Sequence, residues 1–458
     1  MSLATGVKKM IPPTHLSRRL ALQSMLFSTG NGAFNTGSAV YFTQIIGLTA
    51  AQVGLGLTIA GVVSFVVAYP AGKLVDRIGA RYMWAGGTIL GAATFAFWPF
   101  IHGFTAYLAV SLLFEVLNNL GYAGYNAYVL DVLPEKERVE TQAHLYSALN
   151  LGFTLGAIIG GVTLAFNDND VLRWIPYVSV VLMLFNSASI LRLPRAPHER
   201  VPGDATTSRR PKPTTPSPLR NPGWLFSSFF QSIIWSNQVL LNIVIPLWLV
   251  QQTDSPHWLL AWLFGTNTVL CIFLPAYTSK GVNTISDALR RARYATGFFV
   301  VSCAITMITH STAGFITALL VWLGHVTVTG AELAIGSASW AFQAKLMDPT
   351  RRGEYGGAAE VTGTLGRFWA PAVFTWLALS WKAHWHFVHW GWVAIAAICV
   401  VGMIGLHPAG YAAERFAIRH FEPEPDELDE LAAEAAAASD EPSGPVFDAG
   451  VERHPDLS

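Results

Sequence analysis

The sequence predicts an all-α polytopic membrane protein with twelve transmembrane helices in two six-helix halves. Three observations lead to this fold class. Only 13% of the 458 residues are charged while 52% are hydrophobic, and the mean hydropathy is +0.40, whereas a soluble chain is about a quarter charged. Apolar runs of about 20 residues recur along the chain, which is the length that a helix needs to cross a bilayer. Basic residues gather in alternate loops.

The apolar runs, divided at their polar interruptions, give twelve candidate spans. Helices are expected because a backbone in hydrocarbon must satisfy its hydrogen bonds internally. The expected spans are 20–46, 52–71, 82–101, 104–130, 142–165, 172–193, 223–251, 257–278, 294–310, 313–342, 356–381 and 387–407.

The distribution of Lys and Arg orients these spans. With loops assigned alternately to the two sides, 26 of the 29 basic residues lie on the side of the N-terminus, while Arg173 and Lys382 lie on the other side and Arg367 lies inside a span. Basic loops remain in the cytoplasm. Both termini are therefore expected there, in a multi-pass protein of the plasma (cell) membrane.

A long polar segment divides the chain. Residues 194–222 are rich in Pro, Ser, Thr and Arg, which predicts a flexible cytoplasmic linker between an N-terminal half at 20–193 and a C-terminal half at 223–407. A shift of 214 residues places Arg138 on Arg352 and Gly152 on Gly366. This offset favours a parallel repeat of six helices.

The ends of the chain are polar. Residues 1–19 are expected to be a cytoplasmic N-terminus. Residues 408–458 are expected to be an acidic cytoplasmic tail, mostly disordered, because the segment lacks a wide apolar stripe. The three cysteines lie singly inside apolar runs, so neither a disulfide framework nor a metal site is predicted.

The decapeptide GKLVDRIGAR at 72–81 separates the second and third spans. Its four charged residues are expected to place it in a short loop at the membrane surface, and its glycines to let the loop turn tightly. This segment resembles the signature loop of the major facilitator superfamily, a family of secondary transporters. The resemblance covers residues 17–410 and implies the twelve-helix fold of that family.

The resemblance also implies a conformational latch. In the family the signature aspartate, here Asp76, docks at the positive N-terminus of the eleventh span, near Gly356 and Gly357. The arginines of the loop face an acid at the end of span four. The alternative is that this basic loop only fixes the topology. The residues assigned to the latch are Gly72, Asp76, Arg77, Gly79, Arg81 and Asp131.

Span five carries glycines with the spacing of a motif typical of the antiporter (exporter) branch of this superfamily, which includes drug/proton antiporters. Their alternative role is close helix packing. Ala157 stands where that motif has proline, and Leu117 stands where proton-linked drug exporters carry a buried arginine. The four glycines are Gly152, Gly156, Gly160 and Gly161.

Three charged residues fall near the middle of spans: Glu115, Glu332 and Arg367. Each costs about 2.5 to 3.5 kcal/mol at the bilayer centre, so they are expected to face a cavity or one another. Arg367 is expected to pair with Glu332 or Glu115. It is not expected to pair with Glu360, which is about 10.5 Å away along the helix. The alternative to a role in transport is a structural ion pair.

Polar residues concentrate on spans one, four, seven and ten, which line the central cavity in this superfamily. Amide pairs between helices are the alternative explanation for each of them. The candidate substrate-binding and coupling residues are Asn31, Asn35, Glu115, Asn118, Asn119, Tyr122, Tyr125, Asn126, Asn237, Gln238, Asn242, His325, Glu332 and Arg367.

These features predict a secondary active transporter that moves a small organic molecule by alternating access. The favoured function is proton-coupled efflux of a drug-like or hydrophobic metabolite, with Glu332 or Glu115 as the protonatable group. The alternatives are an uptake facilitator or symporter for a sugar, organic acid or other polar metabolite, and a non-transporting receptor or scaffold. We found no catalytic motif, P-loop or dinucleotide fingerprint, so an enzyme, a cofactor and a nucleic-acid partner are not predicted. The lipid bilayer, a small molecule and protons are the expected partners of a monomer.

Overall fold

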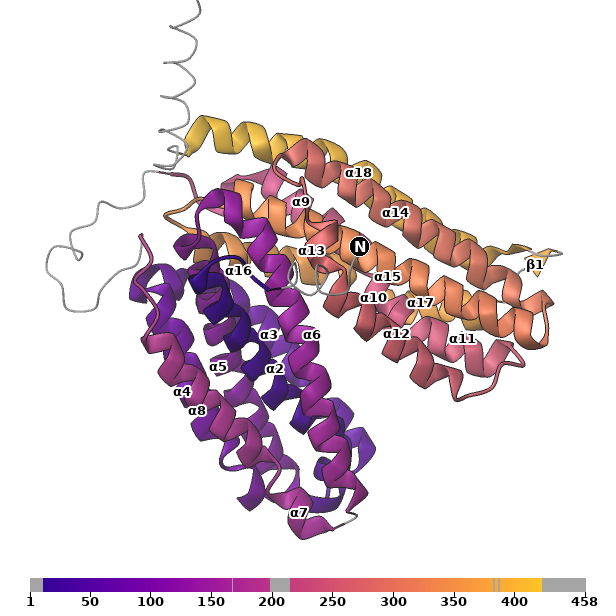
Figure 1. Cartoon of the computed structure of the whole chain (residues 1–458), viewed down its shortest axis with the longest axis horizontal. Helices are drawn as coiled ribbons and strands as arrows, with labels where there is room; N and C mark the ends of the chain where they lie inside the picture. Colours follow the sequence, from indigo (N-terminus) through magenta and orange to yellow (C-terminus); the bar gives the residue numbers. More distant parts are fainter. Residues whose placement is uncertain (1–10, 167, 198–214, 382–383, 386–387, 422–458) are drawn as a thin grey trace, which may run out of the picture. The chain divides into compact units, whose positions relative to one another are not determined.

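The structure, a computed structural model, describes residues 11–166, 168–197, 215–381, 384–385 and 388–421. Figure 1 shows helices α2 to α8 grouped in one bundle and α9 to α18 in another. The helices of the first bundle are α2 (His15–Val40), α3 (Ala50–Ile78), α4 (Ala80–Phe95), α5 (Gly103–Val132), α6 (Glu135–Ala165), α7 (Asn169–Arg173) and α8 (Pro176–Leu191).

The second bundle contains more short helices. Its helices are α9 (Pro222–Ile234), α10 (Asn237–Val239), α11 (Ile245–Gln252), α12 (Leu259–Phe273), α13 (Pro275–Thr278), α14 (Ile285–Ile308), α15 (Gly314–Leu346), α16 (Arg352–Arg367), α17 (Ala370–Thr375) and α18 (Trp390–His420). Short π-helical segments lie at Tyr41–Ile45, Leu240–Val244 and Trp376–Ser380, and 3₁₀ turns lie at Trp98–Phe100, Pro218–Arg220 and Thr309–Ser311. One antiparallel pair, β1 (His384–Trp385) with β2 (Val388–His389), precedes α18.

The predicted all-α fold with twelve spans is confirmed. Within the described residues, eight helical segments are long and apolar enough to cross a membrane, and they match predicted spans two, four, five, six, seven, nine, ten and twelve. The other four predicted spans coincide with α2, α4, α12 with α13, and α16 with α17, which are shorter or more polar. The short β1–β2 pair lies in the connection between the last two spans.

The two halves repeat the same helix packing. In the first half α6 packs along α2, and in the second half α16 packs along α9. At these two contacts a Cβ on Gly152 would lie 2.2 Å from the Met25 carbonyl oxygen, and one on Gly366 would lie 2.5 Å from the Phe229 carbonyl oxygen. The 214-residue offset therefore relates two glycines that both allow close packing against a neighbouring helix. This agreement supports the predicted internal repeat.

Three of the four motif glycines in α6 are packing residues. A Cβ at Gly156 would lie 2.2 Å from the Thr29 carbonyl oxygen, and one at Gly160 would lie 2.5 Å from the Ala33 carbonyl oxygen. Gly161 has nothing within 4 Å of that position, so its assignment as a helix-packing glycine is wrong. A residue one position further along a helix points about 100° away from its neighbour, which explains the difference.

The segment 72–81 is mostly helical, so the predicted loop is wrong for Gly72–Ile78. Helix α3 runs to Ile78, and the chain turns only at Gly79, whose φ of +110° suits glycine. Lys73, Leu74 and Arg77 are good helix formers, and a helix can continue beyond the membrane surface. The charges then lie on its last turns.

The boundaries outside the halves also differ from prediction. Helix α18 continues to His420, so the tail predicted from 408 begins too early. Residues 422–458, with the rest of that tail, lie outside the described residues, as do 198–214 of the predicted linker. At the end of the linker, the Asn221 side chain caps α9 by accepting a hydrogen bond from the Trp224 amide at 3.0 Å.

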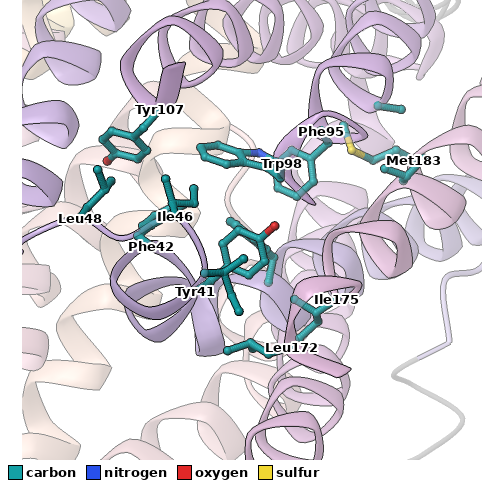
Figure 2. Close-up of a cluster of buried hydrophobic side chains, with 14 residues drawn as sticks. Tyr41, Phe42, Ile46, Leu48, Phe95, Trp98, Tyr107, Leu172, Ile175 and Met183 are labelled. Carbon is teal, nitrogen blue, oxygen red and sulfur yellow. The ribbon is translucent and has the colours of Figure 1, made fainter. Parts of the chain in front are cut away.

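An aromatic cluster joins the helix ends of the first half opposite to the 72–81 segment (Figure 2). Ring centroids lie 4.8 Å apart for Phe34 and Phe95, 5.2 Å for Phe42 and Trp98, and 5.1 Å for Phe42 and Tyr107. These rings come from α2, from the segments that follow α2 and α4, and from α4 and α5. Such dense packing favours motion of the half as one body.

Gly156→Val tests the packing of α6 on α2. The valine side chain would overlap the α2 backbone, so we expect a loss of about 1–3 kcal/mol of stability. Thermal unfolding of the purified protein in detergent, followed by tryptophan fluorescence, measures this. Gly161→Val is the matched control on the same helix and should unfold like the wild type. Equal unfolding temperatures for the two variants would contradict the packing role.

Candidate functional site

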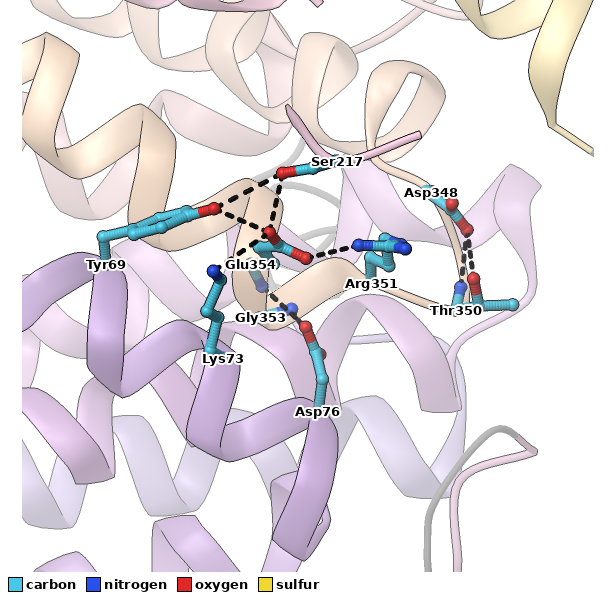
Figure 3. A network of polar contacts seen from close by, with 9 residues as sticks. All are labelled: Tyr69, Lys73, Asp76, Ser217, Asp348, Thr350, Arg351, Gly353 and Glu354. Carbon is cyan, nitrogen blue, oxygen red and sulfur yellow. Dashed lines mark hydrogen bonds and ion pairs between the residues drawn. The ribbon is translucent and has the colours of Figure 1, made fainter. Parts of the chain in front are cut away.

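The first candidate site joins the end of α3 to the start of α16 (Figure 3). The Asp76 Oδ1 accepts a hydrogen bond from the Gly353 amide, and its Oδ2 accepts one from the Glu354 amide, each at 2.8 Å. These amides belong to the first turn of α16, where backbone donors have no partner within the helix and the helix dipole is positive. The carboxylate thus bridges the two halves. We call this cluster the latch.

A second carboxylate in the latch gathers donors from both halves and the linker. The Glu354 Oε1 accepts from the Tyr69 hydroxyl at 2.6 Å and from Ser217 Oγ at 2.8 Å, and its Oε2 accepts from Arg351 at 2.8 Å. Lys73 Nζ lies 3.9 Å away. Glu354 precedes the span predicted at 356–381. Its burial alone would raise the pKa of the carboxyl, but the bonds from Tyr69, Ser217 and Arg351 outweigh this effect and hold the pKa below the ordinary value.

Glycines let the two backbones come this close. A Cβ on Gly72 would lie 2.0 Å from the Gly353 carbonyl oxygen, and a Cβ on Gly353 would lie 2.3 Å from the Gly72 carbonyl oxygen. Gly357 meets the Ala68 carbonyl oxygen in the same way at 2.6 Å. The signature glycine Gly72 is therefore needed for approach to α16, and not for a turn as the sequence suggested.

Further polar contacts between the halves surround the latch. Arg352, at the start of α16, reaches Asp131 at the end of α5 with 3.2 Å between NH1 and Oδ1. Arg138, near the start of α6, donates to the Ala344 carbonyl oxygen of α15 at 3.4 Å. Lys345 pairs with Glu135. Arg138 and Arg352 are related by the 214-residue repeat, and both cross to the other half.

The two arginines of the signature segment differ in burial. Arg81 is buried, and its NH1 donates to the Leu193 carbonyl oxygen at 2.6 Å, at the end of the first half. Arg77 is exposed. The predicted docking point at Gly356 and Gly357 lies one turn too deep, because α16 begins at Arg352.

The second candidate site is an open cavity of about 1670 Å³ between helices of both halves. Arg352 and Gly353 of the latch line one end of it. The predicted site residues that line it are Asn119, Tyr122, Tyr125, Asn126 and Arg367. Residues that the sequence did not indicate line it as well: Gln142, Tyr146, Gln231, Trp340, Gln343 and Glu360.

The expected partner of Arg367 is wrong. Its NH2 donates to Glu360 Oε1 at 2.7 Å, and both side chains are more than 40% exposed. Two helical turns separate their backbones, but two long side chains that point toward each other span this distance. Because the Arg367–Glu360 pair faces an open cavity, both side chains stay hydrated. The desolvation penalty that led us to expect a partner on another helix is therefore absent.

Glu332 is held in a buried cluster beside the cavity. It is 5% exposed, and its Oε1 accepts from the hydroxyl of Tyr146 on α6 of the other half. Its Oε2 accepts from Asn267 Nδ2 of α12 at 2.9 Å, and the same amide lies 3.1 Å from Thr329 Oγ1. Tyr146 also lines the cavity, so it stands between the cavity and the buried carboxylate.

Tyr146 and Asn267 are functional candidates that the sequence analysis missed. Tyr146 lies on span five and Asn267 lies on span eight. The family resemblance points instead to spans one, four, seven and ten. A signal was present for one of them, because Asn267 is an amide in the middle of the strongly apolar run 257–278. A carboxylate and an amide that lie at mid-depth on different spans can form a hydrogen bond. Only the fold shows whether the two side chains meet.

Glu115 lies inside the first half. Its Oε1 accepts from Asn119 Nδ2 at 3.0 Å, and the same amide donates to Ser64 Oγ of α3 at 2.9 Å. The structure therefore does not bring Glu115 to Arg367. Within the described residues it belongs to an α3–α5 contact, which is the alternative foreseen for interhelical amides.

The remaining candidates are dispersed. Asn31 and Asn35 lie on α2, where Asn35 is exposed and Asn31 is half-buried. Asn242 donates to the Gln238 carbonyl oxygen one turn earlier, at 2.9 Å. Asn237 and His325 are fully buried in the second half. Asn118 lines a different cavity, inside the first half.

Comparison with known proteins decides the family. The model that describes the Major Facilitator Superfamily matches residues 20–371. The chain belongs to the major facilitator superfamily. It is a multi-pass membrane transporter, as the signature decapeptide and the twelve spans predicted.

Similar proteins include transporters of several kinds. A Na(+), Li(+), K(+)/H(+) antiporter of Planococcus maritimus is 24% identical, covering 75% of this chain and 85% of that protein. Among solved structures, the fucose:proton symporter of E. coli has a TM-score of 0.64 at 14% identity, over 86% of this chain and 98% of that one. An outward-facing bacterial homologue of the iron transporter ferroportin has a TM-score of 0.62 at 14% identity, over 88% and 100%. These structures share the superfamily fold.

Asp76→Asn tests the latch. The amide loses the charge that favours a helix N-terminus, and its nitrogen cannot accept a hydrogen bond, so we expect the halves to separate at this end about tenfold more often. Spin labels on Ile78→Cys and Lys280→Cys, both exposed, report the separation by pulsed electron spin resonance. Cys271, Cys303 and Cys399 are buried and stay unlabelled.

Asp287→Asn is the matched control for this experiment. Asp287 lies in the equivalent segment of the second half, and its carboxylate accepts from the Thr284 hydroxyl within its own half. Its replacement should leave the distance distribution unchanged. Identical distributions for wild type and Asp76→Asn would contradict the latch.

The same labels test the role of Glu354 in the latch through pH. Because the pKa of this carboxyl is lowered from its ordinary value of 4.5, its stabilisation is present above that value and is lost as the pH falls through the lowered pKa. The distribution should therefore broaden as the pH falls below 4.5. Glu354→Gln should be broad already at pH 7. The response to pH should differ between the wild type and Glu354→Gln, and an equal response of the two proteins would contradict this role.

Proposed function

We propose that this protein is a proton-coupled antiporter that exports a small organic molecule from the cytoplasm across the plasma membrane. Glu332 carries the proton. One observation supports this choice above the others: the buried Glu332 carboxylate accepts a hydrogen bond from Tyr146 across the division between the halves. A protonation event at this site acts directly on the contact between the two bodies that must move.

The coupling follows from the strength of that hydrogen bond. A charged carboxylate binds a hydroxyl donor more strongly than a neutral carboxyl does. Protonation of Glu332 therefore weakens the bond to Tyr146 and favours separation of the halves at the latch end. Release of the proton restores the bond and favours closure. A ligand or proton can shift such an equilibrium only by its different affinity for the two states.

In the proposed transport cycle, the closed latch corresponds to a state that is closed toward the cytoplasm. With Asp76 seated on α16 and Asp131 paired with Arg352, the halves are closed at the latch end. The basic residues on that side support a cytoplasmic position for it. The closed latch then corresponds to a cavity that is shut toward the cytoplasm, and its opening lets the substrate enter from inside.

Two observations support the direction of transport. The α6 glycines match the exporter motif in spacing, although three of them serve packing. The bacterial relative with 24% identity is named as an antiporter that uses protons. Antiport requires that proton and substrate favour opposite steps, which a carboxylate at the contact between the halves can provide.

Exchange of an alkali cation for a proton is a second candidate. The relative is named as a Na(+), Li(+), K(+)/H(+) antiporter. Around Glu332 lie the Tyr146 hydroxyl, the Asn267 amide and the Thr329 hydroxyl. Oxygen atoms of this kind are the ligands that hard cations prefer.

Proteoliposomes that contain a trapped pH dye test both candidates. Addition of a substrate on one side should move protons in the opposite direction, and parallel samples receive Na⁺, K⁺, Li⁺ or lipophilic dyes and drugs. With the compound that drives protons in the wild type, Glu332→Gln should abolish coupled proton movement and keep solute exchange. Tyr146→Phe should shift the pH dependence of transport without abolishing it.

Glu115→Gln is the matched control, because Glu115 is also a carboxylate within a span but bonds within the first half. It should keep proton coupling. Full coupling in Glu332→Gln, or loss in Glu115→Gln alone, would contradict the assignment of the proton to Glu332. Proton movement driven only by alkali cations would favour the second candidate.

A further inference from the structure

A second cavity lies inside the first half. It is a partly open hollow of about 610 Å³, open solvent included, and is lined by residues of α2, α4, α5, α6 and α8. Four residues, Ser24, Tyr122, Tyr125 and Leu149, line both this cavity and the larger one between the halves. The smaller cavity is therefore adjacent to the larger one, and these four residues form the boundary between them. We call it the side pocket.

The side pocket holds buried amides without partners. Asn186 is fully buried on α8, and neither its Oδ1 nor its Nδ2 has a hydrogen-bond partner among the described residues. Gln23 is 3% exposed on α2, and its Oε1 also has no partner there. Buried polar groups are nearly always hydrogen-bonded, and each exception requires an explanation. Both residues line the pocket, which places these unpartnered atoms beside the space that a bound molecule would fill.

The rest of the lining defines the chemistry of that molecule. Aromatic and apolar side chains dominate, including Phe27, Trp84, Phe114 and Met183. None of the described residues that line the pocket is Asp, Glu, Lys, Arg or His. A charged group would lose its hydration here without gaining a counter-charge, which is costly. A neutral aromatic body with one group that both donates and accepts hydrogen bonds fits the lining.

We propose that the side pocket is a binding site for neutral aromatic compounds that carry an amide or hydroxyl group, held by Asn186 and Gln23. The inference rests on the proposed function only in taking these compounds as the transported class. The amide of Asn186 can pair with a ligand amide through two hydrogen bonds, one in each direction. The aromatic side chains of the pocket add to the binding energy through buried apolar area and contacts between rings.

The mixture of apolar and polar residues that line the pocket agrees with this use. Small-molecule sites are concave, mostly apolar and carry a few placed polar groups. A molecule with a large apolar body and one polar group can contact the apolar side chains and also bond to the amides of Asn186 and Gln23.

Equilibrium binding of 2-naphthamide to the purified full chain tests the proposal, with 2-naphthoate as a charged compound of the same shape. The wild type should bind 2-naphthamide saturably, and 2-naphthoate at least tenfold more weakly. Asn186→Leu should weaken 2-naphthamide binding by about tenfold, since it removes both hydrogen bonds and keeps the volume. This variant should fold normally, because it also removes an unpaired buried amide.

A pair of glycines on α4 provides a steric test with a matched control. A Cβ on Gly91 would meet Met183 Cε at 3.1 Å and Phe114 at 3.7 Å, so Gly91→Val pushes into the pocket wall. Gly86 has nothing within 4 Å of that position. Gly91→Val should lose binding, whereas Gly86→Val should bind like the wild type.

Three results would overturn the proposal: no saturable binding of 2-naphthamide, equal affinity for 2-naphthoate, or wild-type binding by both Asn186→Leu and Gly91→Val. The assay uses no gradient and no transport, so it is independent of proton coupling. Binding that depends on Asn186, together with full coupling in Glu332→Gln, would support the side pocket and refute the proton assignment. Coupling lost in Glu332→Gln, together with unchanged binding in both pocket variants, would support the proton assignment and refute the side pocket.

Discussion

The contact between the Asp76 carboxylate and the first amides of α16 is the interaction on which the arrangement of the two halves depends. A helix N-terminus offers unpaired donors and a partial positive charge, and a carboxylate satisfies both. Here the donor helix and the carboxylate belong to different halves. The glycine contact of Gly72 with Gly353 brings the backbones close enough for this geometry. Without it, Glu354 and Arg352 would also lose their partners in the first half.

The contacts within each half differ in kind from the contacts between halves. Inside the first half, glycine-mediated helix packing and the aromatic cluster around Phe34 and Trp98 bury large apolar surfaces. Between the halves, carboxylates, arginines and hydroxyls dominate near the latch. Hydrogen bonds to water can replace polar contacts of this kind when the halves separate, whereas apolar packing is lost only at high cost. The contacts between the halves are therefore of a kind that can break while each half keeps its packing.

The sequence alone was sufficient for the fold and for the main feature of the latch. Charge is costly in hydrocarbon, so apolar runs and basic loops determine the spans and their number. The resemblance of GKLVDRIGAR to the signature segment of the family implied Asp76 and its target, the start of span eleven, within one helical turn. The extension of α3 to Ile78 was missed, because hydropathy marks where the membrane ends and not where the helix ends.

The details of the site could not be predicted, because they depend on side-chain directions. Arg367 reaches Glu360 along one helix, although the rise between them suggested otherwise. Glu332 meets Tyr146 and Asn267 from two other helices, and no spacing in the sequence relates these three positions. The side pocket is formed by five helices, and its unpaired amide Asn186 looks in the sequence like any other polar residue in an apolar span.

Hydrogen exchange at the Gly353 and Glu354 amides tests most directly whether the proton site controls the latch. These amides lie in the first turn of α16, so Asp76, and not the helix itself, protects them. In Glu332→Gln, which mimics the protonated carboxyl, our account predicts that they exchange faster than in the wild type, because the halves separate more often. Equal exchange rates at these two amides would contradict the coupling of Glu332 to the latch.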